Sequence, residues 1–346
     1  MRPGNITLMD KYEIIACRSR DSFAERMEEI SARTISYLTE EQKHHRRLQY
    51  CKVFLSDIQN QYRQLIESKL YQEILSDAAP TIVEQVPLDG SKITLLLKTS
   101  DEVCPFVFQP FRLTEEEASC NNSYLETMIL FEKYLKSQKD QDSPMDRNLV
   151  RTWIYVNDID NNYNGVVKAR NDVFKRYGLS VDTHFIASTG IGGNSCVRNA
   201  FVAMDFLTYP NIREEDKFYL KALDHLSPTH DYGVSFERGT RLSLPGKKIY
   251  YISGTASIDK YGHVLYLGDL EKQTNRLLEN IEALLKEGEA SMDDIRYFII
   301  YLRDVSDYSA TEAYMRNRYP TVPHVIVGAK VCRPEWLIEM ECIAEK

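Results

Sequence analysis

Two glutamates with one residue between them, Glu339 and Glu341, are the residues of this chain best placed for acid chemistry. They lie in the run Leu337-Ile-Glu-Met-Glu-Cys-Ile343, where strand alternation puts both carboxyl groups on one face. One interpretation is an edge strand with a solvated acidic face. The other is a carboxyl pair whose mutual repulsion and partial burial raise one pKa enough for acid catalysis.

Two β-rich runs at the end of the chain must position these carboxyl groups. The first begins at Pro323, the second holds the glutamates, and a polar break at residues 332–335 separates them. This pattern predicts a hairpin with a longer loop.

Two other stretches and several arginines suggest ligand binding. The glycine-rich run Thr189-Gly-Ile-Gly-Gly-Asn-Ser195 would need a following helix to form a dinucleotide site, but residues 201–207 predict a strand. A loop that donates N–H groups to an anion is therefore favoured. The small residues 252–258 predict either close backbone approach to a ligand or a softened strand. Guanidinium groups suit carboxylates, and the candidates are Arg151, Arg170, Arg198, Arg238 and Arg241.

Composition excludes several classes of function. The chain has 346 residues and a net charge of −8, which argues against nucleic-acid binding. No export signal and no membrane-spanning run are evident, and seven dispersed cysteines suggest reduced thiols, so we expect a cytoplasmic protein. We expect no metal and no cofactor, because the paired histidines at 44–45 and 225/230 lack a convincing ligand pattern.

An internal repeat organises the chain. Three strand-like runs end in Asp57, Asp158 and Asp304, and each Asp is predicted to cap the helix that follows. Helix-like stretches precede them at residues 22–42, 114–138 and 268–287, and strand pairs follow at 81–98, 184–206 and 324–343. Residues 136–146 predict a mobile loop. The chain thus divides into units 1–100, 101–212 and 213–346, an α+β protein of three tandem units.

This unit resembles the Rid (YjgF-type) family, small α+β proteins with a chorismate-mutase-like fold that form trimers with clefts between subunits. Three copies in one chain imply an intramolecular pseudo-trimer, a monomer or at most a weak oligomer. Residues 149–346 more closely resemble chorismatases, through Leu149-Val-Arg-Thr-Trp-Ile-Tyr, Ser188-Thr-Gly-Ile-Gly192, Ser235-Phe-Glu-Arg238, Ile252-Ser-Gly-Thr-Ala-Ser-Ile258 and Cys332-Arg333.

The chorismatase resemblance implies roles for individual residues. Glu339 takes the place of the catalytic acid, with Glu341 supplying the like charge that holds its proton. The residues implied in substrate binding are Arg151, Arg238, Gly254, Thr255, Ala256, Cys332, His324 and Tyr232. The segment 231–235 is shorter than the chorismatase pattern and lacks an arginine found there.

The leading hypothesis is therefore cleavage of the enolpyruvyl ether of chorismate, or of a related cyclic enol-ether acid, with release of pyruvate. Its partner would be a small carboxylic acid, with no nucleic acid and no membrane. One alternative is a Rid-type enamine or imine deaminase, in which His324, and His184 in the second unit, replace the arginine expected there. The other is a non-catalytic small-acid binding protein.

Overall fold

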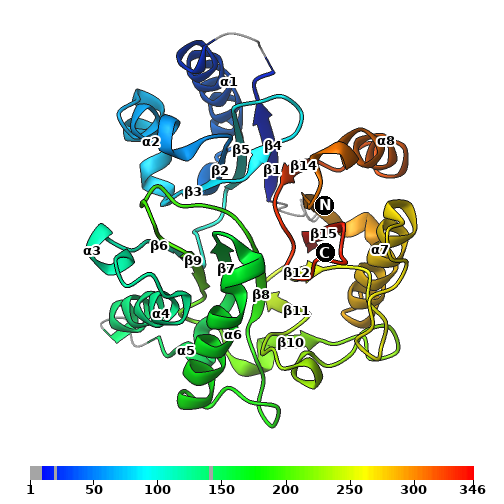
Figure 1. The fold of residues 1–346 in the computed structure, drawn as a ribbon. Helices are drawn as coiled ribbons and strands as arrows, with labels where there is room; N and C mark the ends of the chain where they lie inside the picture. Colours follow the sequence, from blue (N-terminus) through cyan, green and yellow to red (C-terminus); the bar gives the residue numbers. More distant parts are fainter. Residues whose placement is uncertain (1–9, 19–21, 140–142) are drawn as a thin grey trace, which may run out of the picture.

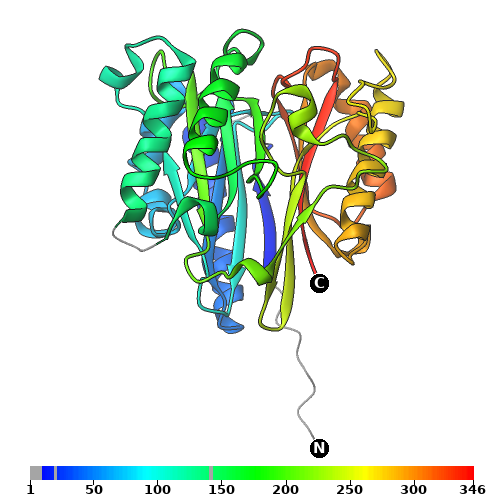
Figure 2. The same cartoon turned by 90° about the horizontal axis from the view of Figure 1, so that it is seen from below.

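The computed structural model describes residues 10–18, 22–139 and 143–346. Figure 1 shows three lobes arranged around a centre, with helices on the outside and strands towards the inside. Figure 2, turned by 90°, shows the strands of the three lobes running side by side between the outer helices. The fold is of the mixed α+β class that the sequence predicted.

The first unit contains one four-stranded sheet and two helices on its outer face. Its elements are β1 (Lys11–Ala16), α1 (Phe23–Lys43), β2 (Arg47–Leu55), α2 (Ile58–Ile66), β3 (Thr81–Glu84) and β5 (Ile93–Ser100). The strand order is β1-β5-β2-β3, with β2 and β3 parallel and β5 antiparallel to both of its neighbours.

The second unit has the same arrangement. Its elements are β6 (Val107–Phe111), α3 (Glu115–Ala118), α4 (Ser123–Lys139), α5 (Met145–Asn148), β7 (Leu149–Val156), α6 (Ile159–Arg176), β8 (Ala187–Gly192) and β9 (Val202–Thr208). The order is β6-β9-β7-β8, again with one parallel pair, β7 and β8.

The third unit extends this plan at one edge. Its elements are β10 (Lys217–Leu220), β11 (Gly239–Leu244), β12 (Lys247–Thr255), α7 (Leu270–Glu287), β13 (Ile295–Leu302), α8 (Tyr308–Arg318), β14 (His324–Gly328) and β15 (Ile338–Glu345). The order is β10-β11-β12-β15-β13-β14-β4, and β4 (Val86–Pro87) comes from the first unit. The β14–β4 pairing joins the third unit to the first through backbone hydrogen bonds.

The predicted terminal hairpin is wrong, because β14 and β15 do not pair with each other. β13 lies between them, parallel to β14 and antiparallel to β15. The physical reason is the crossover through α8, which returns the chain parallel to β13 on one side and leaves the other side for β15. As a result, β15 is an internal strand between β12 and β13 and has no free edge.

The helix starts follow local capping chemistry in most places. Ser22 forms a capping box with Glu25, and the side chain of Asp57 accepts a hydrogen bond from the Asn60 N–H at 3.1 Å. Asp304 caps the 3₁₀ turn that precedes α8. Asp158 was predicted to act in the same way and does not: it has φ +47° and makes no side-chain cap hydrogen bond.

The second helix-like stretch is also interrupted, since α3 ends at Ala118 and α4 begins at Ser123. Of the loop predicted at residues 136–146, the first part continues α4 to Lys139, and residues 140–142 lie outside the described part of the chain.

Apolar packing holds each helix to its sheet. On α7, Leu277, Ile281 and Leu284 are fully buried, as their helical spacing predicted. Burial of each such side chain stabilises the fold by roughly 1.5–3 kcal/mol. No helix in the described residues has the length and apolar character needed to cross a membrane. All seven cysteines are free thiols.

Candidate active site

A cavity of about 330 Å³ lies between the second and third units. The second unit contributes α6 and β8, and the third contributes β12, β15 and the loops before β11 and β15. Its lining residues include Tyr163, Arg170, Ser188, Gly190, Tyr232, Phe236, Arg238, Gly254, Ala256, Ile258, Cys332, Arg333, Trp336 and Glu339.

Glu339 is the acid of this cavity. Its side chain comes from the internal strand β15, and the residue is only 4% exposed. Burial, followed by the negative charge of Glu341, raises the pKa of Glu339 to about 8, while Arg151 and Arg238 act in the opposite direction. The interpretation as a solvated acidic edge is therefore wrong, and Glu339 holds its proton at neutral pH.

Gly254 makes room for this carboxyl group. A Cβ atom at Gly254 would clash with Glu339 Oε1, so only glycine allows β12 to pass so close to the acid. Ala256 also lines the cavity, but Thr255 points elsewhere and donates its hydroxyl hydrogen bond to the Ser253 carbonyl at 2.9 Å. The small residues after β12 therefore serve close packing around the acid.

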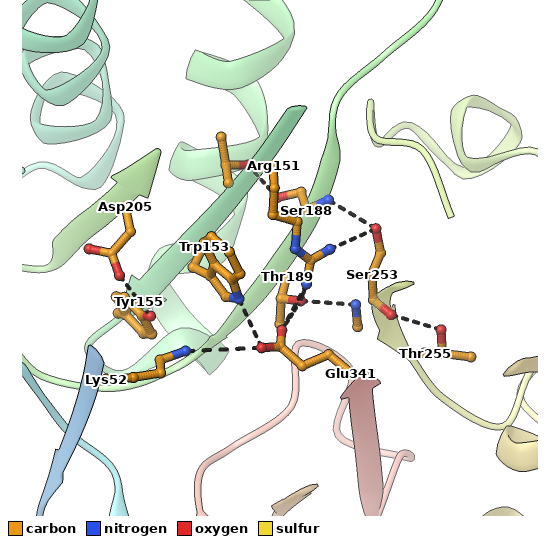
Figure 3. Close-up of polar contacts among 12 residues, drawn as sticks. Lys52, Arg151, Trp153, Tyr155, Ser188, Thr189, Asp205, Ser253, Thr255 and Glu341 are labelled. Atoms are coloured by element: carbon orange, nitrogen blue, oxygen red, sulfur yellow. Dashed lines mark hydrogen bonds and ion pairs between the residues drawn. The ribbon is translucent and has the colours of Figure 1, made fainter. Parts of the chain in front are cut away.

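Glu341 lies behind the cavity in a buried polar network, which Figure 3 shows. Its carboxylate accepts hydrogen bonds from Arg151 Nη2 and Trp153 Nε1, both at 2.8 Å, and from the Thr189 hydroxyl. Three donors, one of them the ion-paired Arg151, hold the Glu341 carboxyl group in place beside Glu339.

Arg151 was predicted to bind a substrate carboxylate, but it is not among the residues that line the cavity. The guanidinium group pairs with Glu341 and donates to Ser253 Oγ at 3.0 Å, and the residue is 2% exposed. Alternation along β7 puts Arg151, Trp153 and Tyr155 on the same face of the strand. Its contribution to the site is indirect, through the charge of Glu341.

Lys52 brings the first unit into the same network. Its ammonium nitrogen is 4.0 Å from Glu341 Oε1 and lies over the rings of Trp153 and Tyr155, at 5.5 and 5.1 Å from their centroids. Burial lowers the pKa of Lys52, and the negative charge of Glu341 opposes this shift. All three units therefore meet around one carboxylate.

Three arginines line the cavity instead. Arg238 was predicted there, Arg170 was one of the five candidate arginines, and Arg333 belonged to a matched motif without a predicted role. Arg170 is 1% exposed, and its Nε and Nη2 atoms have no hydrogen-bond partner within the described residues. Arg238 donates to the Ser227 carbonyl at 2.9 Å, and its Nε atom is likewise unpartnered there.

Arg333 donates to the Gly262 carbonyl at 3.1 Å and stacks on Tyr232 and Trp336, at 4.7 and 4.8 Å from the ring centroids. None of the three forms an ion pair with a carboxylate in the described parts of the chain, although all three face one cavity. Buried guanidinium nitrogens without acceptors are costly, and Arg170 and Arg238 both carry such atoms. Arg170 lies on α6, fifteen residues after the pattern 149–155 and outside every matched motif, so nothing in the sequence distinguished it from the other candidate arginines.

The remaining walls are aromatic and small. Tyr163, Tyr232, Phe236 and Trp336 supply ring surfaces, and a Cβ atom at Gly190 would lie 2.9 Å from the Tyr163 ring. Burial raises the pKa of Cys332 to about 12, so its sulfur stays a thiol and is a poor nucleophile.

His324 lies in a different and larger cleft, between the third and first units. Its Nε2 atom is 3.1 Å from Glu312 Oε2. In the third unit, His324 pairs in register with Phe298, which lies six residues before Asp304. In the second unit, the residue six before Asp158 is Thr152, and it pairs with Ser188. Ser188, and not His184, is therefore the equivalent of His324 in the second unit.

The glycine-rich run also has a structural role in place of the predicted anion loop. The N–H groups of Gly192, Gly193 and Asn194 donate to the carbonyls of Lys330, Val156 and Glu84. These bonds fasten the second unit to the third and the first. Within the described residues there is no group of three or more His, Cys, Asp and Glu side chains able to hold a metal ion.

Comparison with known proteins identifies the class. A family described as Endoribonuclease L-PSP matches residues 243–346. A RutC family protein of Pyrococcus abyssi is 33% identical over 98 residues, which cover 28% of this chain and 77% of that protein. The 3-aminoacrylate deaminase RutC of Acinetobacter baylyi is 31% identical over 98 residues, 28% of this chain and 78% of that protein. The chain belongs to the Rid superfamily, to which RutC proteins belong.

Among solved structures, the similarity to a chorismatase extends over nearly the whole chain. It covers 97% of this chain and 98% of the chorismatase, with a TM-score of 0.66 and 17% sequence identity. The two proteins share a fold.

Proposed function

We propose that this protein cleaves the enol ether of an anionic cyclic substrate, chorismate or a close analogue, by protonation from Glu339. The observation that carries the proposal is the combination of a protonated, buried carboxyl group with three unpaired guanidinium groups in one cavity. A general acid that stays protonated near neutral pH is what enol-ether cleavage needs.

The reaction begins with proton transfer from Glu339 to the methylene carbon of the enolpyruvyl group. The ether-bearing carbon becomes electron-poor, and water adds to it and loses a proton. The resulting hemiketal breaks its bond to the ring oxygen, which takes up a proton, and pyruvate and a cyclic alcohol leave. One water molecule is consumed, and Glu339 regains its proton from solvent. Lyase-type loss of the ring oxygen to give an aromatic acid begins with the same protonation.

The buried network fixes the acidity of Glu339. Arg151, Trp153 and Thr189 donate hydrogen bonds to Glu341, and the charge of Glu341 opposes ionisation of Glu339. As the substrate is protonated, the Glu339 carboxylate forms beside Glu341, and the nearby Arg238 and Arg151 charges limit the cost. Arg151 thus acts on the reaction through Glu341 and touches no substrate.

The arginines define the class of substrate. Chorismate carries one carboxylate on its ring and one on its enolpyruvyl group, and Arg170, Arg238 and Arg333 offer guanidinium groups to both from the cavity wall. Tyr232, Phe236 and Trp336 provide flat surfaces for a ring between these charges. The segment 231–235 lacks an arginine of the chorismatase pattern. Arg170 and Arg333, which come from elsewhere in the chain, supply guanidinium groups to the cavity in its place.

A second candidate reaction is deamination of a small enamine or imine acid. The similarity to a 3-aminoacrylate deaminase favours it for the C-terminal unit. Protonation of an enamine carbon by Glu339 is chemically similar to protonation of an enol ether. A third possibility is binding of a small acid without turnover.

We also propose that the three units replace the three subunits of a Rid trimer, so that the chain works as a monomer. The surfaces that subunits bury in such a trimer are covered within this chain, as the β14–β4 pairing illustrates. Light scattering should give a mass near 40.2 kDa. A stable species of three chains would contradict this proposal.

The decisive experiment incubates the purified protein with chorismate and measures pyruvate release and aromatic products by mass spectrometry. We expect stoichiometric pyruvate. Ammonia release from an enamine acid without turnover of chorismate would favour the deaminase, and neither activity would favour the binding protein.

A further inference from the structure

A second, smaller chamber of about 220 Å³ lies next to the active cavity. Phe236 and Arg238 line both spaces. The guanidinium carbons of Arg170 and Arg238 are 5.7 and 5.3 Å from the centroid of the Phe236 ring. The wall between the cavity and the chamber is therefore made largely of these side chains.

The charges around the chamber favour an anion. Its basic lining residues are His184, Lys221, His230 and Arg238, and Glu237 is the one acid in the lining. The Glu237 carboxyl group already accepts a hydrogen bond from the Phe185 N–H at 2.9 Å. Asp231, which is not part of the lining, pairs with His230 at 3.4 Å. Lys221 and Arg238 therefore outnumber the one acid, Glu237, in the lining.

Two buried polar atoms of the chamber lack partners. Arg238 Nε and His184 Nε2 have no hydrogen-bond partner among the residues that the structure describes. Arg238 is 5% exposed and is held by the Ser227 carbonyl. The His184 ring is fixed by stacking on Tyr219, with 4.4 Å between the ring centroids. An oxyanion in the chamber would satisfy such groups, whose desolvation is otherwise uncompensated.

We infer that this chamber is a carboxylate subsite that receives the small keto acid released in the cavity next to it. Arg238 borders both spaces, so it contacts the carboxylate before and after cleavage. The smaller volume suits the smaller of the two products, and the ring product stays on the Glu339 side. This inference rests on the proposed function, because that reaction is the source of the keto acid.

The test uses pyruvate as the probe and two exposed valines as matched positions. Val181 lines the chamber and is 57% exposed, whereas Val103 is 92% exposed and is not part of this lining. Calorimetry should show pyruvate binding to the wild type and to Val103→Trp, and at least ten-fold weaker binding to Val181→Trp, whose indole plugs the chamber. Methyl pyruvate, which lacks the charge, should bind at least ten-fold more weakly than pyruvate.

Leu223→Trp provides a second plug if Val181→Trp is unstable, since Leu223 lines the chamber and is 54% exposed. Equal pyruvate affinity in wild type and both plugged variants, or no binding to the wild type, would overturn the inference. In turnover assays, pyruvate inhibition should persist at saturating chorismate. Purely competitive inhibition would place pyruvate in the Glu339 cavity alone. The calorimetric arm needs no turnover, so absence of chorismate cleavage would refute the proposed function and still leave the chamber tested.

Discussion

The Glu339 cavity and the cleft between the third and first units occupy equivalent places and are built for different purposes. Glu339 pairs in register with Tyr301, three residues before Asp304, and Thr94 pairs with Phe54, three residues before Asp57. Thr94 lines the second cleft, which we call the Thr94 cleft. Tyr308 lines it where Tyr163 lines the first. The Thr94 cleft therefore has a threonine at the position equivalent to Glu339.

Charge pairing separates the two sites more clearly than size. The Thr94 cleft is larger, about 910 Å³ against 330 Å³. Its three arginines, however, are neutralised locally: Arg18 by Asp89 at 2.9 Å, Arg33 by Glu29 at 3.7 Å and Arg316 by Glu312 at 2.5 Å. In the Glu339 cavity none of the three arginines forms an ion pair with a carboxylate of the described residues. The two sites therefore differ in charge pairing, and the guanidinium groups without ion pairs belong to the smaller one.

The largest effect should come from Glu339→Gln. The amide keeps the shape and cannot deliver a proton, so turnover should fall by roughly 10²–10⁴-fold, as is typical of a lost acid–base group. Chorismate binding, measured by calorimetry, should be nearly unchanged. A variant with full activity would show that Glu339 is not the acid of the reaction. The difference between Glu339 and Thr94 would then have no functional meaning.

The same variant tests the raised pKa of Glu339 through stability. Between the unfolded pKa near 4.5 and the folded pKa of about 8, the folded state binds more protons, so wild-type stability falls as pH rises through this window. Glu339→Gln should therefore gain stability over the wild type as the pH is raised from 5 to 8. Parallel melting curves at both pH values would show that the pKa of Glu339 is not raised.

Removal of a single cavity arginine should have the next largest effect. Arg170→Met should raise KM for chorismate by about 10- to 100-fold, because a charge-assisted hydrogen bond contributes about 1.5–3 kcal/mol. Arg316→Met is the matched control in the Thr94 cleft, with a side chain 62% exposed, and should leave both kcat and KM unchanged. An equal rise in KM for both variants would break the distinction between the clefts.

Glu341→Gln should act on both acidity and stability. Loss of its charge lowers the pKa of Glu339, so the alkaline limb of the pH–rate profile should move to lower pH. Arg151 would lose its buried partner, which costs about 3–5 kcal/mol of unfolding free energy. An unchanged pH profile in a folded variant would mean that Glu341 has no electrostatic role.

The smallest effect belongs to Thr94→Val. The Thr94 hydroxyl is buried and has no hydrogen-bond partner in the described residues, so its removal should change the unfolding free energy by less than about 1 kcal/mol. Turnover should remain at the wild-type level. Any loss of activity would show that the Thr94 cleft takes part in the reaction.

The sequence predicted the class of fold and the shared face of the two glutamates, and it failed where partners come from distant parts of the chain. Alternation in one strand was enough to place both glutamates on one face, and the repeat located the strands that end at Asp57 and Asp304. The order of the strands depends on how a helix returns the chain, so the terminal hairpin was misplaced. Arg151 lay inside a matched motif, yet its partner is 190 residues away, and no local pattern reports such a distance. Arg170 is buried by Phe236 from another unit, which explains why it looked like one surface arginine among many.

The network around Glu341 also sets an order of events during synthesis. Glu341 follows Lys52 by 289 residues and Arg151 by 190 residues, so both cations leave the ribosome long before the carboxylate of this network. Until Glu341 is made, burial of these cationic side chains in the first two units would carry an uncompensated desolvation cost. The inner faces of these units should therefore stay hydrated and accessible to chaperones. Completion of β15 would then close the centre in a single step. A nascent chain that stops just short of Glu341 should be far more sensitive to proteases than one that includes it.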